Sequence, residues 1–131
     1  MNRWAAAALG RRGEGREIAV RVVGPVESRE LNRRWRGKDK PTNVLSFPAP
    51  DTLSPPAAFR PLGDLVICAD VVRREARRDG KPVSAHWAHM VVHGALHLAG
   101  YDHETGTRER TRMERREIAV LKSFGIGNPY T

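Results

Sequence analysis

The chain has 131 residues, and its 23 Lys and Arg against 15 Asp and Glu give a formal net charge of +8. This length suits one compact domain, and the charge favours an anionic partner, most simply nucleic acid. The single cysteine, Cys68, excludes an intramolecular disulfide. No apolar run approaches the roughly 18 residues of a membrane span. We therefore expect one domain over residues 1–131, located in the cytoplasm and not in a membrane.

The first half of the chain predicts two helices and two strands. We expect a short helix over 4–9 and a strand over 18–23, where β-branched residues dominate. A helix over 26–36 follows, with Leu31 and Trp35 four residues apart and Gly37 as its stop. Residues 43–47 alternate in polarity and end at Pro48, which predicts a strand at a sheet edge.

The second half predicts a central strand and three helices. Residues 48–61 hold five of the nine prolines and are expected to form a loop, whereas 62–68 is almost continuously apolar, as in a central strand that buries Cys68. Asp70 and Ser84 are the expected caps of helices over 70–79 and 84–99. A last helix is expected over 107–124, with Met113, Ile118, Leu121 and Phe124 as candidate core residues. This order predicts an α+β fold, a small mixed β-sheet covered by helices.

The most informative pattern is the spacing of three histidines. His93 and His97 are four residues apart, so both imidazoles leave the same face of a helix. Gly100 lets the chain turn, so that His103 can fold back toward them. Three imidazoles leave a fourth position open, which is typical of catalytic rather than structural zinc. We therefore predict a metal site on a helix and the loop that follows it.

One position departs from the nearest known motif. The spacing matches the metzincin pattern HExxHxxGxxH except that Gly94 stands where the glutamate should be. In zincins that glutamate is the general base of peptide hydrolysis. Gly94 therefore argues against a protease.

The roles of three neighbouring residues stay open. His86 and His89 share the helix face with His93 and His97. His89 is open to two interpretations: it is a hydrogen-bonded structural residue of the helix, or it assists the site by contacting a metal ligand or carrying a proton. For His86 a packed structural role is favoured. Asp102 either orients an imidazole or holds the turn.

Charge around the histidines is unevenly distributed. No Lys or Arg occurs in 83–106, the stretch that holds all five histidines, whereas basic residues flank it on both sides. Cleavage of a phosphodiester builds negative charge, which a guanidinium can stabilise. An arginine from elsewhere in the sequence is therefore expected near the metal.

Three segments in order resemble the YbeY family of bacterial metal-dependent endoribonucleases. They are LNRRWRGKDKPTNVLSFP at 31–48, LGDLVIC at 62–68 and HGALHLAGYDH at 93–103. Met113-Glu114 and the closing helix resemble the end of the family, so that the resemblance covers roughly residues 16 to 130.

The resemblance implies residue roles and an activity. His93, His97 and His103 match the family's ligands for one zinc ion, and Arg36 matches its functionally important arginine. The implied activity is cleavage of single-stranded RNA in maturation of the 3′ end of small-subunit ribosomal RNA and in ribosome quality control. Ribosomal RNA and the small ribosomal subunit are the implied partners. Either metal-bound water or the RNA 2′-hydroxyl is the expected nucleophile.

Two other functions are retained as alternatives. One is a ribosome assembly factor with little intrinsic catalysis, and the other is a metzincin-like metalloprotease. Members of the family usually have an N-terminal strand before their first helix, but here few residues precede Ile18. Either that strand is missing or the natural start lies upstream of Met1. The oligomeric state is not determined by these patterns.

Overall fold

The computed structural model describes residues 2–10, 16–49, 60–101 and 106–130. Each helix and strand that the sequence predicts is present, within two residues of its expected ends, and the α+β class is confirmed. None of the helices in this part of the chain is long and apolar enough to cross a membrane. In order, the elements are α1 (Asn2–Leu9), β1 (Arg16–Val23), α2 (Pro25–Arg36), β2 (Val44–Pro48), β3 (Arg60–Cys68), α3 (Ala69–Arg78), α4 (Val83–Leu98) and α5 (Thr107–Ser123).

The sheet has the strand order β1-β3-β2 and is mixed, as expected. Strand β1 runs parallel to β3, with Val20 opposite Leu65, and β2 runs antiparallel to it, with Ser46 opposite Leu65. The almost continuously apolar strand is therefore the central one, and the strand that ends in proline lies at an edge. Both predictions are confirmed.

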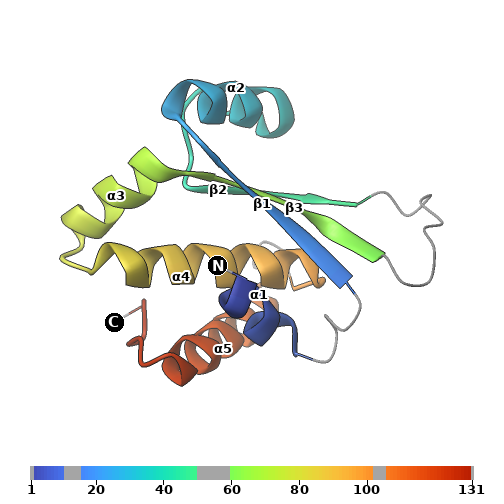
Figure 1. The fold of residues 1–131 in the computed structure, drawn as a ribbon, viewed down its shortest axis with the longest axis vertical. Helices are drawn as coiled ribbons and strands as arrows, with labels where there is room; N and C mark the ends of the chain where they lie inside the picture. The colour runs from blue at the N-terminus through green and yellow to red at the C-terminus, as the bar shows by residue number, and fades with distance from the viewer. Residues whose placement is uncertain (1, 11–15, 50–59, 102–105, 131) are drawn as a thin grey trace.

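Strand β3 is apolar from Leu65 to Cys68, where both of its faces are covered. Leu65 and Ile67 enter the main core, whereas Val66 and Cys68 enter a smaller core together with Leu31 of α2. The predicted burial of Cys68 is confirmed, since it is 0 % exposed. Helix α2 lies beyond one face of the sheet, and α4 runs below the other face with α1 and α5 beneath it (Figure 1).

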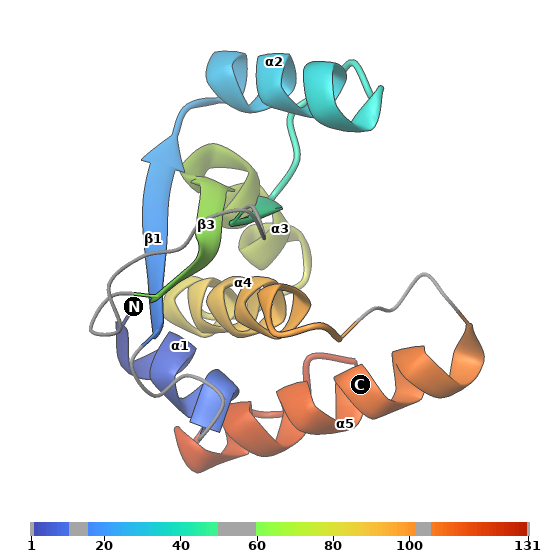
Figure 2. The ribbon, with the colours of Figure 1, turned by 90° about the vertical axis from the view of Figure 1, so that its right-hand side faces the viewer.

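Helix α4 occupies the middle of the molecule, between the sheet and the pair α1 and α5 (Figure 2). Its apolar residues cover most of its circumference, as expected for a helix packed on two sides. Fully buried residues of α4 in the main core include Ala88, Val91, Val92, Ala95 and Leu96. A rigid, buried helix of this kind holds its few polar side chains in fixed positions.

Both predicted helix caps are wrong. Helix α3 begins at Ala69, so Asp70 lies inside its first turn, and α4 begins at Val83, one residue before Ser84. The residues at the cap positions are Cys68 and Pro82, and neither makes a side-chain capping bond. The negative charge of Asp70 still suits the positive end of the helix dipole.

Two boundaries and one core residue also differ from expectation. Pro48 belongs to β2 and Pro61 to β3, so the strands take over both ends of the expected loop, and 50–59 lie outside the described residues. Met113 and Leu121 of α5 are buried as predicted, and Phe124, which directly follows α5, packs against the core, but Ile118 is half-buried. Val120 and Glu117 are the other buried residues of α5.

Candidate functional site

A cavity of about 560 Å³ brings Arg36 together with His93 and His97. Its walls come from the end of α2, the segment that follows it, strand β2 and the C-terminal half of α4. The charged residues among the described lining are Arg36, Lys38 and Lys40, and no Asp or Glu is among them. The cavity therefore favours an anionic ligand.

The end of α2 and the segment after it are fixed by buried polar residues. Gly37 adopts the left-handed conformation, with φ 70°, and turns the chain at the end of α2. Asn32, 3 % exposed, donates from Nδ2 to the Lys40 carbonyl at 2.8 Å. Ser28, 2 % exposed, donates to the Thr42 carbonyl and accepts from its amide, both at 3.0 Å. The backbone that carries Arg36 and Lys40 is therefore held in a defined conformation.

The two helical histidines meet as their spacing predicts. The rings of His93 and His97 have centroids 4.8 Å apart and are inclined by 72°. Both side chains are half-buried, and both line the cavity. Two imidazoles one helical turn apart at the wall of a cavity are a donor set that fits a borderline divalent metal such as Zn²⁺. The third predicted ligand, His103, lies outside the described residues, as does Asp102.

Glu117 of α5 is a buried carboxylate that contacts His93 and His89 of α4. It is 0 % exposed. Its Oε1 accepts from Nδ1 of His93 at 3.1 Å, and its Oε2 accepts from Nε2 of His89 and from the Tyr130 hydroxyl, both at 2.8 Å. A carboxylate that accepts three hydrogen bonds is well suited to holding neighbouring imidazoles in one orientation.

These contacts dominate the electrostatics of Glu117 and Tyr130. Burial by itself raises the pKa of Glu117, but the hydrogen bonds from His89 and His93 outweigh it and lower the pKa to about 2. Burial, together with the charge and hydrogen bonding of Glu117, raises the pKa of Tyr130 above its ordinary value. Glu117 is therefore ionised and Tyr130 neutral at physiological pH.

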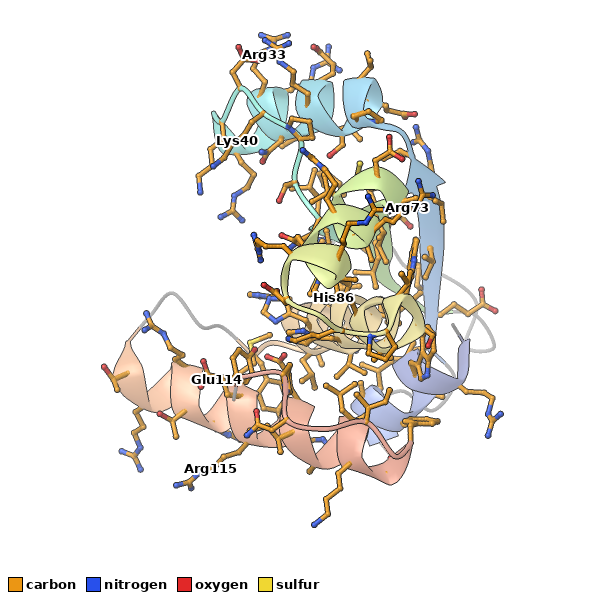
Figure 3. The ribbon with its side chains drawn as sticks, turned by 90° about the vertical axis from the view of Figure 1, so that its left-hand side faces the viewer. Arg33, Lys40, Arg73, His86, Glu114 and Arg115 are labelled. Atoms are coloured by element: carbon orange, nitrogen blue, oxygen red, sulfur yellow. The ribbon has the colours of Figure 1, made fainter. Side chains whose placement is uncertain are left out.

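The other two histidines are hydrogen-bonded residues of α4. His86 is 6 % exposed, and its Nε2 lies 2.9 Å from Oε1 of Glu75. His86 appears beside the middle of the molecule in Figure 3. His89 is hydrogen-bonded too, but through the carboxylate that also holds His93. The two roles expected for His89, as a hydrogen-bonded helix residue and as a residue linked to a metal ligand, are therefore compatible.

Two sets of residues are candidates for holding a metal ion. His89, His93 and Glu117 offer ligand atoms that all lie within 4.8 Å of one another. A metal held there would displace the three hydrogen bonds of Glu117 and would bind a group with no exposure to solvent. Because Nδ1 of His93 contacts Glu117, the opposite edge of the ring, which carries Nε2, points away from Glu117. His93 and His97 line the open cavity, so a metal held by these two residues would instead face a substrate.

Gly94 packs its backbone against the central strand. A Cβ atom at this position would lie 2.6 Å from Cδ2 and 3.1 Å from Cδ1 of Leu65, which is itself fully buried. A glutamate in its place would point into the core instead of the cavity. The close packing of α4 against β3 therefore requires glycine at position 94, where the metzincin pattern has glutamate.

Sequence reasoning missed Glu117 and Tyr130. The residues Met113, Glu117, Val120 and Leu121 recur at i, i+4, i+7 and i+8, which places Glu117 within the apolar stripe of α5. A carboxylate in such a stripe is the signal that points to a buried partner. No comparable signal singles out Tyr130, because its contact depends on how the C-terminal segment packs.

The model of a protein family described as Endoribonuclease YbeY matches residues 3–125 of this chain. The Endoribonuclease YbeY of Halorhodospira halophila is 57 % identical over 120 residues, which cover 90 % of this chain and 77 % of that protein. That of Alkalilimnicola ehrlichii is 54 % identical over 132 residues, covering 98 % and 78 %. That of Methylococcus capsulatus is 55 % identical over 127 residues, covering 97 % and 81 %.

A solved structure shares the fold. The solution structure of TM1509 from Thermotoga maritima superposes with a TM-score of 0.58 at 26 % sequence identity. The match covers 92 % of this chain and 81 % of that one. The arrangement of helices around the small mixed sheet is therefore similar to one that has been observed experimentally.

Proposed function

This chain belongs to the YbeY family of endoribonucleases, and from that premise we propose that it is a zinc-dependent enzyme that cleaves single-stranded RNA. We place its action in the cytoplasm, in maturation of the 3′ end of small-subunit ribosomal RNA and in ribosome quality control. Its proposed partners are ribosomal RNA and the small ribosomal subunit. We also propose that residues 1–131 form one YbeY-type domain.

One observation carries the proposal. Arg36, from α2, and His93 and His97, from α4, line one cavity although they are far apart in the sequence. All charged residues in the described part of the lining are cationic. Metal-binding side chains beside a cationic wall suit the cleavage of a polyanion better than that of a peptide.

The proposed division of labour follows from these positions. His93, His97 and His103 would hold one zinc ion, and Glu117 would keep the ring of His93 in orientation. A zinc ion in such a site supplies Lewis acidity, which acidifies water and polarises a phosphoryl oxygen. Arg36 binds the phosphate and stabilises the negative charge that develops on its oxygens. Lys38 and Lys40 attract the adjoining phosphates.

The packing of Gly94 weighs against a metzincin-like protease. The glutamate base of that class would have to occupy a position where even a Cβ atom overlaps Leu65. Among the described residues that line the cavity there is no carboxylate to replace it. Peptidase activity that a chelator abolishes would be needed to revive that alternative.

An assembly factor with little catalysis is the other alternative. It predicts tight binding to small-subunit particles together with slow cleavage of any RNA. Elemental analysis combined with cleavage assays on free RNA and on small-subunit particles distinguishes it from the enzyme, which cleaves at least one of the two substrates in a metal-dependent manner.

The proposed roles are tested by two substitutions that should fail in different ways. We expect His97→Ala to lower both the bound metal, by elemental analysis, and the cleavage of a single-stranded RNA. We expect Arg36→Glu to retain the metal but to lower the rate of cleavage by at least about 10²-fold, because a charge-stabilising donor is replaced by a like charge. Circular dichroism checks that both variants are folded.

Arg34→Glu is the matched control, because it makes the same change of charge on an exposed residue of α2 that does not line the cavity. We expect it to cleave at close to the rate of the unsubstituted chain. Unchanged cleavage by His97→Ala, in a preparation free of contaminating nuclease, would show that the mechanism is wrong.

A further inference from the structure

Trp35 is a large aromatic side chain left mostly in water. It lies in the last turn of α2 and is 63 % exposed, although Leu31, one turn earlier, is half-buried in the smaller core. Tryptophan is highly buried on average, so an exposed one on a folded helix is informative. Its apolar surface is available to a ligand.

The position of Trp35 is supported and directed. Its ring stands nearly perpendicular to that of Phe47 in β2, at 77° with centroids 6.1 Å apart. Phe47 is itself half-buried and packs against the smaller core. Both rings line the cavity that also contains Arg36, His93 and His97. An exposed ring anchored by a second ring is a preorganised contact surface, which loses little conformational entropy on binding.

The charges around this aromatic pair indicate the class of ligand. Arg36, Lys38 and Lys40 line the same cavity, and no Asp or Glu accompanies them among the described lining residues. Figure 3 shows Lys40 beside the end of α2, on the side where the chain turns back toward the sheet. Cations that follow phosphates, together with an aromatic side chain on which a base can stack, are how proteins bind single-stranded nucleic acid.

We propose that Trp35, supported by Phe47, is a stacking platform for one base of a single-stranded RNA whose neighbouring phosphate lies at Arg36. The platform selects single strands, because a base inside a duplex is already stacked on its neighbours and presents no free face. It tolerates different bases, since each has a π-face. This inference rests on the proposed function, because it names how that cavity recognises its substrate.

The test measures binding apart from cleavage. Fluorescence anisotropy follows binding of the zinc-loaded full chain to a labelled single-stranded 2′-O-methyl oligonucleotide, and a gel confirms that the recovered probe is intact. A second probe of equal length carries abasic sugars at its centre, and a third is the duplex of the first. The proteins compared are the unsubstituted chain, Trp35→Ala, Trp35→Phe and Val26→Ala.

Val26→Ala is the matched control, because Val26 is another exposed apolar residue of α2, 83 % exposed and outside the cavity lining. We expect it to bind like the unsubstituted chain. We expect Trp35→Ala to weaken binding of the base-containing single strand by about 5- to 150-fold, the range for loss of one stacked base. Trp35→Phe should recover most of that loss.

Two further readouts separate stacking from a general effect on charge or folding. The slope of log affinity against log salt should be the same for Trp35→Ala and the unsubstituted chain, because stacking involves no phosphate contact. The unsubstituted chain should prefer the base-containing single strand over both the abasic probe and the duplex. Trp35→Ala should lose most of that preference.

Equal affinity of Trp35→Ala and the unsubstituted chain for the first probe would overturn the inference. So would an equal loss on the abasic probe, which would mean that no base is recognised. A third contrary result is a change in sedimentation of Trp35→Ala with unchanged RNA affinity, which would assign Trp35 to an interface between copies. Failure of the proposed function would appear separately, as an absence of metal-dependent cleavage by the unsubstituted chain.

Discussion

Glu117 is a charged residue without solvent exposure, and its three hydrogen bonds join α5 and the C-terminal segment to the histidines of α4. Ionised groups are seldom fully buried unless they are paired or hydrogen-bonded. Its contact with Nδ1 of His93 is the arrangement that fixes the orientation of a metal-binding imidazole. We therefore assign to Glu117 the positioning of His93.

We expect Glu117→Gln to lower the affinity for zinc by about 10- to 100-fold, the usual effect of losing a carboxylate behind a histidine ligand. The shape of the side chain is kept, but its charge is lost and one acceptor oxygen becomes a donor. Competition with a chromophoric chelator measures the affinity. Glu114→Gln is the control, since it makes the same chemical change on α5, whereas the carboxylate described as the hydrogen-bond partner of His89 and His93 is that of Glu117.

Tyr130→Phe provides a gentler version of the same change, because it removes one hydrogen bond to Glu117 and leaves the carboxylate in place. It should fall between Glu117→Gln and the unsubstituted chain in zinc affinity. If folded Glu117→Gln binds zinc as tightly as the unsubstituted chain does, Glu117 has no positioning role.

At the scale of elements, the contact between α4 and β3 determines where the histidines lie relative to the sheet. Gly94 allows the helix to approach Leu65 closely, and the Gly94 carbonyl accepts from Oγ of Ser46 in β2 at 3.5 Å. The position of α4 against both strands therefore sets the distance between the histidines and the wall of the cavity formed by β2.

We expect Gly94→Ala to destabilise the protein by about 1–3 kcal/mol, because an added methyl group overpacks the core. This direction is opposite to intrinsic helix propensity, by which alanine gains about 1 kcal/mol over glycine. Urea unfolding measures the change in the free energy of unfolding.

The cause of that change is tested by a double-mutant cycle with Leu65→Ala, which removes the atoms that the new methyl group meets. The double variant should lose less stability than the sum of the two single variants. Additive losses, or a more stable Gly94→Ala, would mean that the close approach is not constraining.

The elements were predictable because their signals are local. Alternation and β-branching predicted β1, β2 and the central β3, and the spacing of His93 and His97 predicted their shared helix face. The caps were not predictable, because Asp and Ser are favoured both at the cap and in the first turn, so a shift of one or two residues leaves the pattern unchanged. The placements of Glu117 and Trp35 depend on packing between elements, which no local pattern encodes.

At the scale of the whole molecule, the candidate site combines residues from two helices, α2 and α4, that lie on opposite faces of the sheet beside its edge strand β2. Arg36 reaches the cavity from α2, and the histidines reach it from α4, which is packed between the sheet and α5 (Figure 2). Only the family resemblance singled out Arg36 from the other arginines of α2, and the fold supplies the physical reason. Neither helix alone supplies the cavity with both a pair of histidines and a cationic side chain.

This assembly has an electrostatic consequence for the whole molecule. Basic side chains lie at both ends of the molecule, with Arg33 and Lys40 near one end and Arg115 near the other (Figure 3). The net charge of +8 attracts a polyanion over a distance of about one Debye length, roughly 8 Å at physiological salt. Under the proposed function, such a field would guide RNA to the surface, and Arg36, Lys38 and Lys40 would bind the phosphates that enter the cavity.

The central claim is that the metal lies on the cavity side of His93, facing Arg36, and not on the side of Glu117. Anomalous diffraction at the zinc absorption edge, from crystals of the full chain grown with zinc, tests it most directly. The predicted result is one peak per chain at about 2.0–2.1 Å from nitrogen atoms of His93, His97 and His103, with Glu117 still hydrogen-bonded to Nδ1 of His93. A peak bound by the Glu117 carboxylate and His89, with His97 not coordinated, would contradict the account.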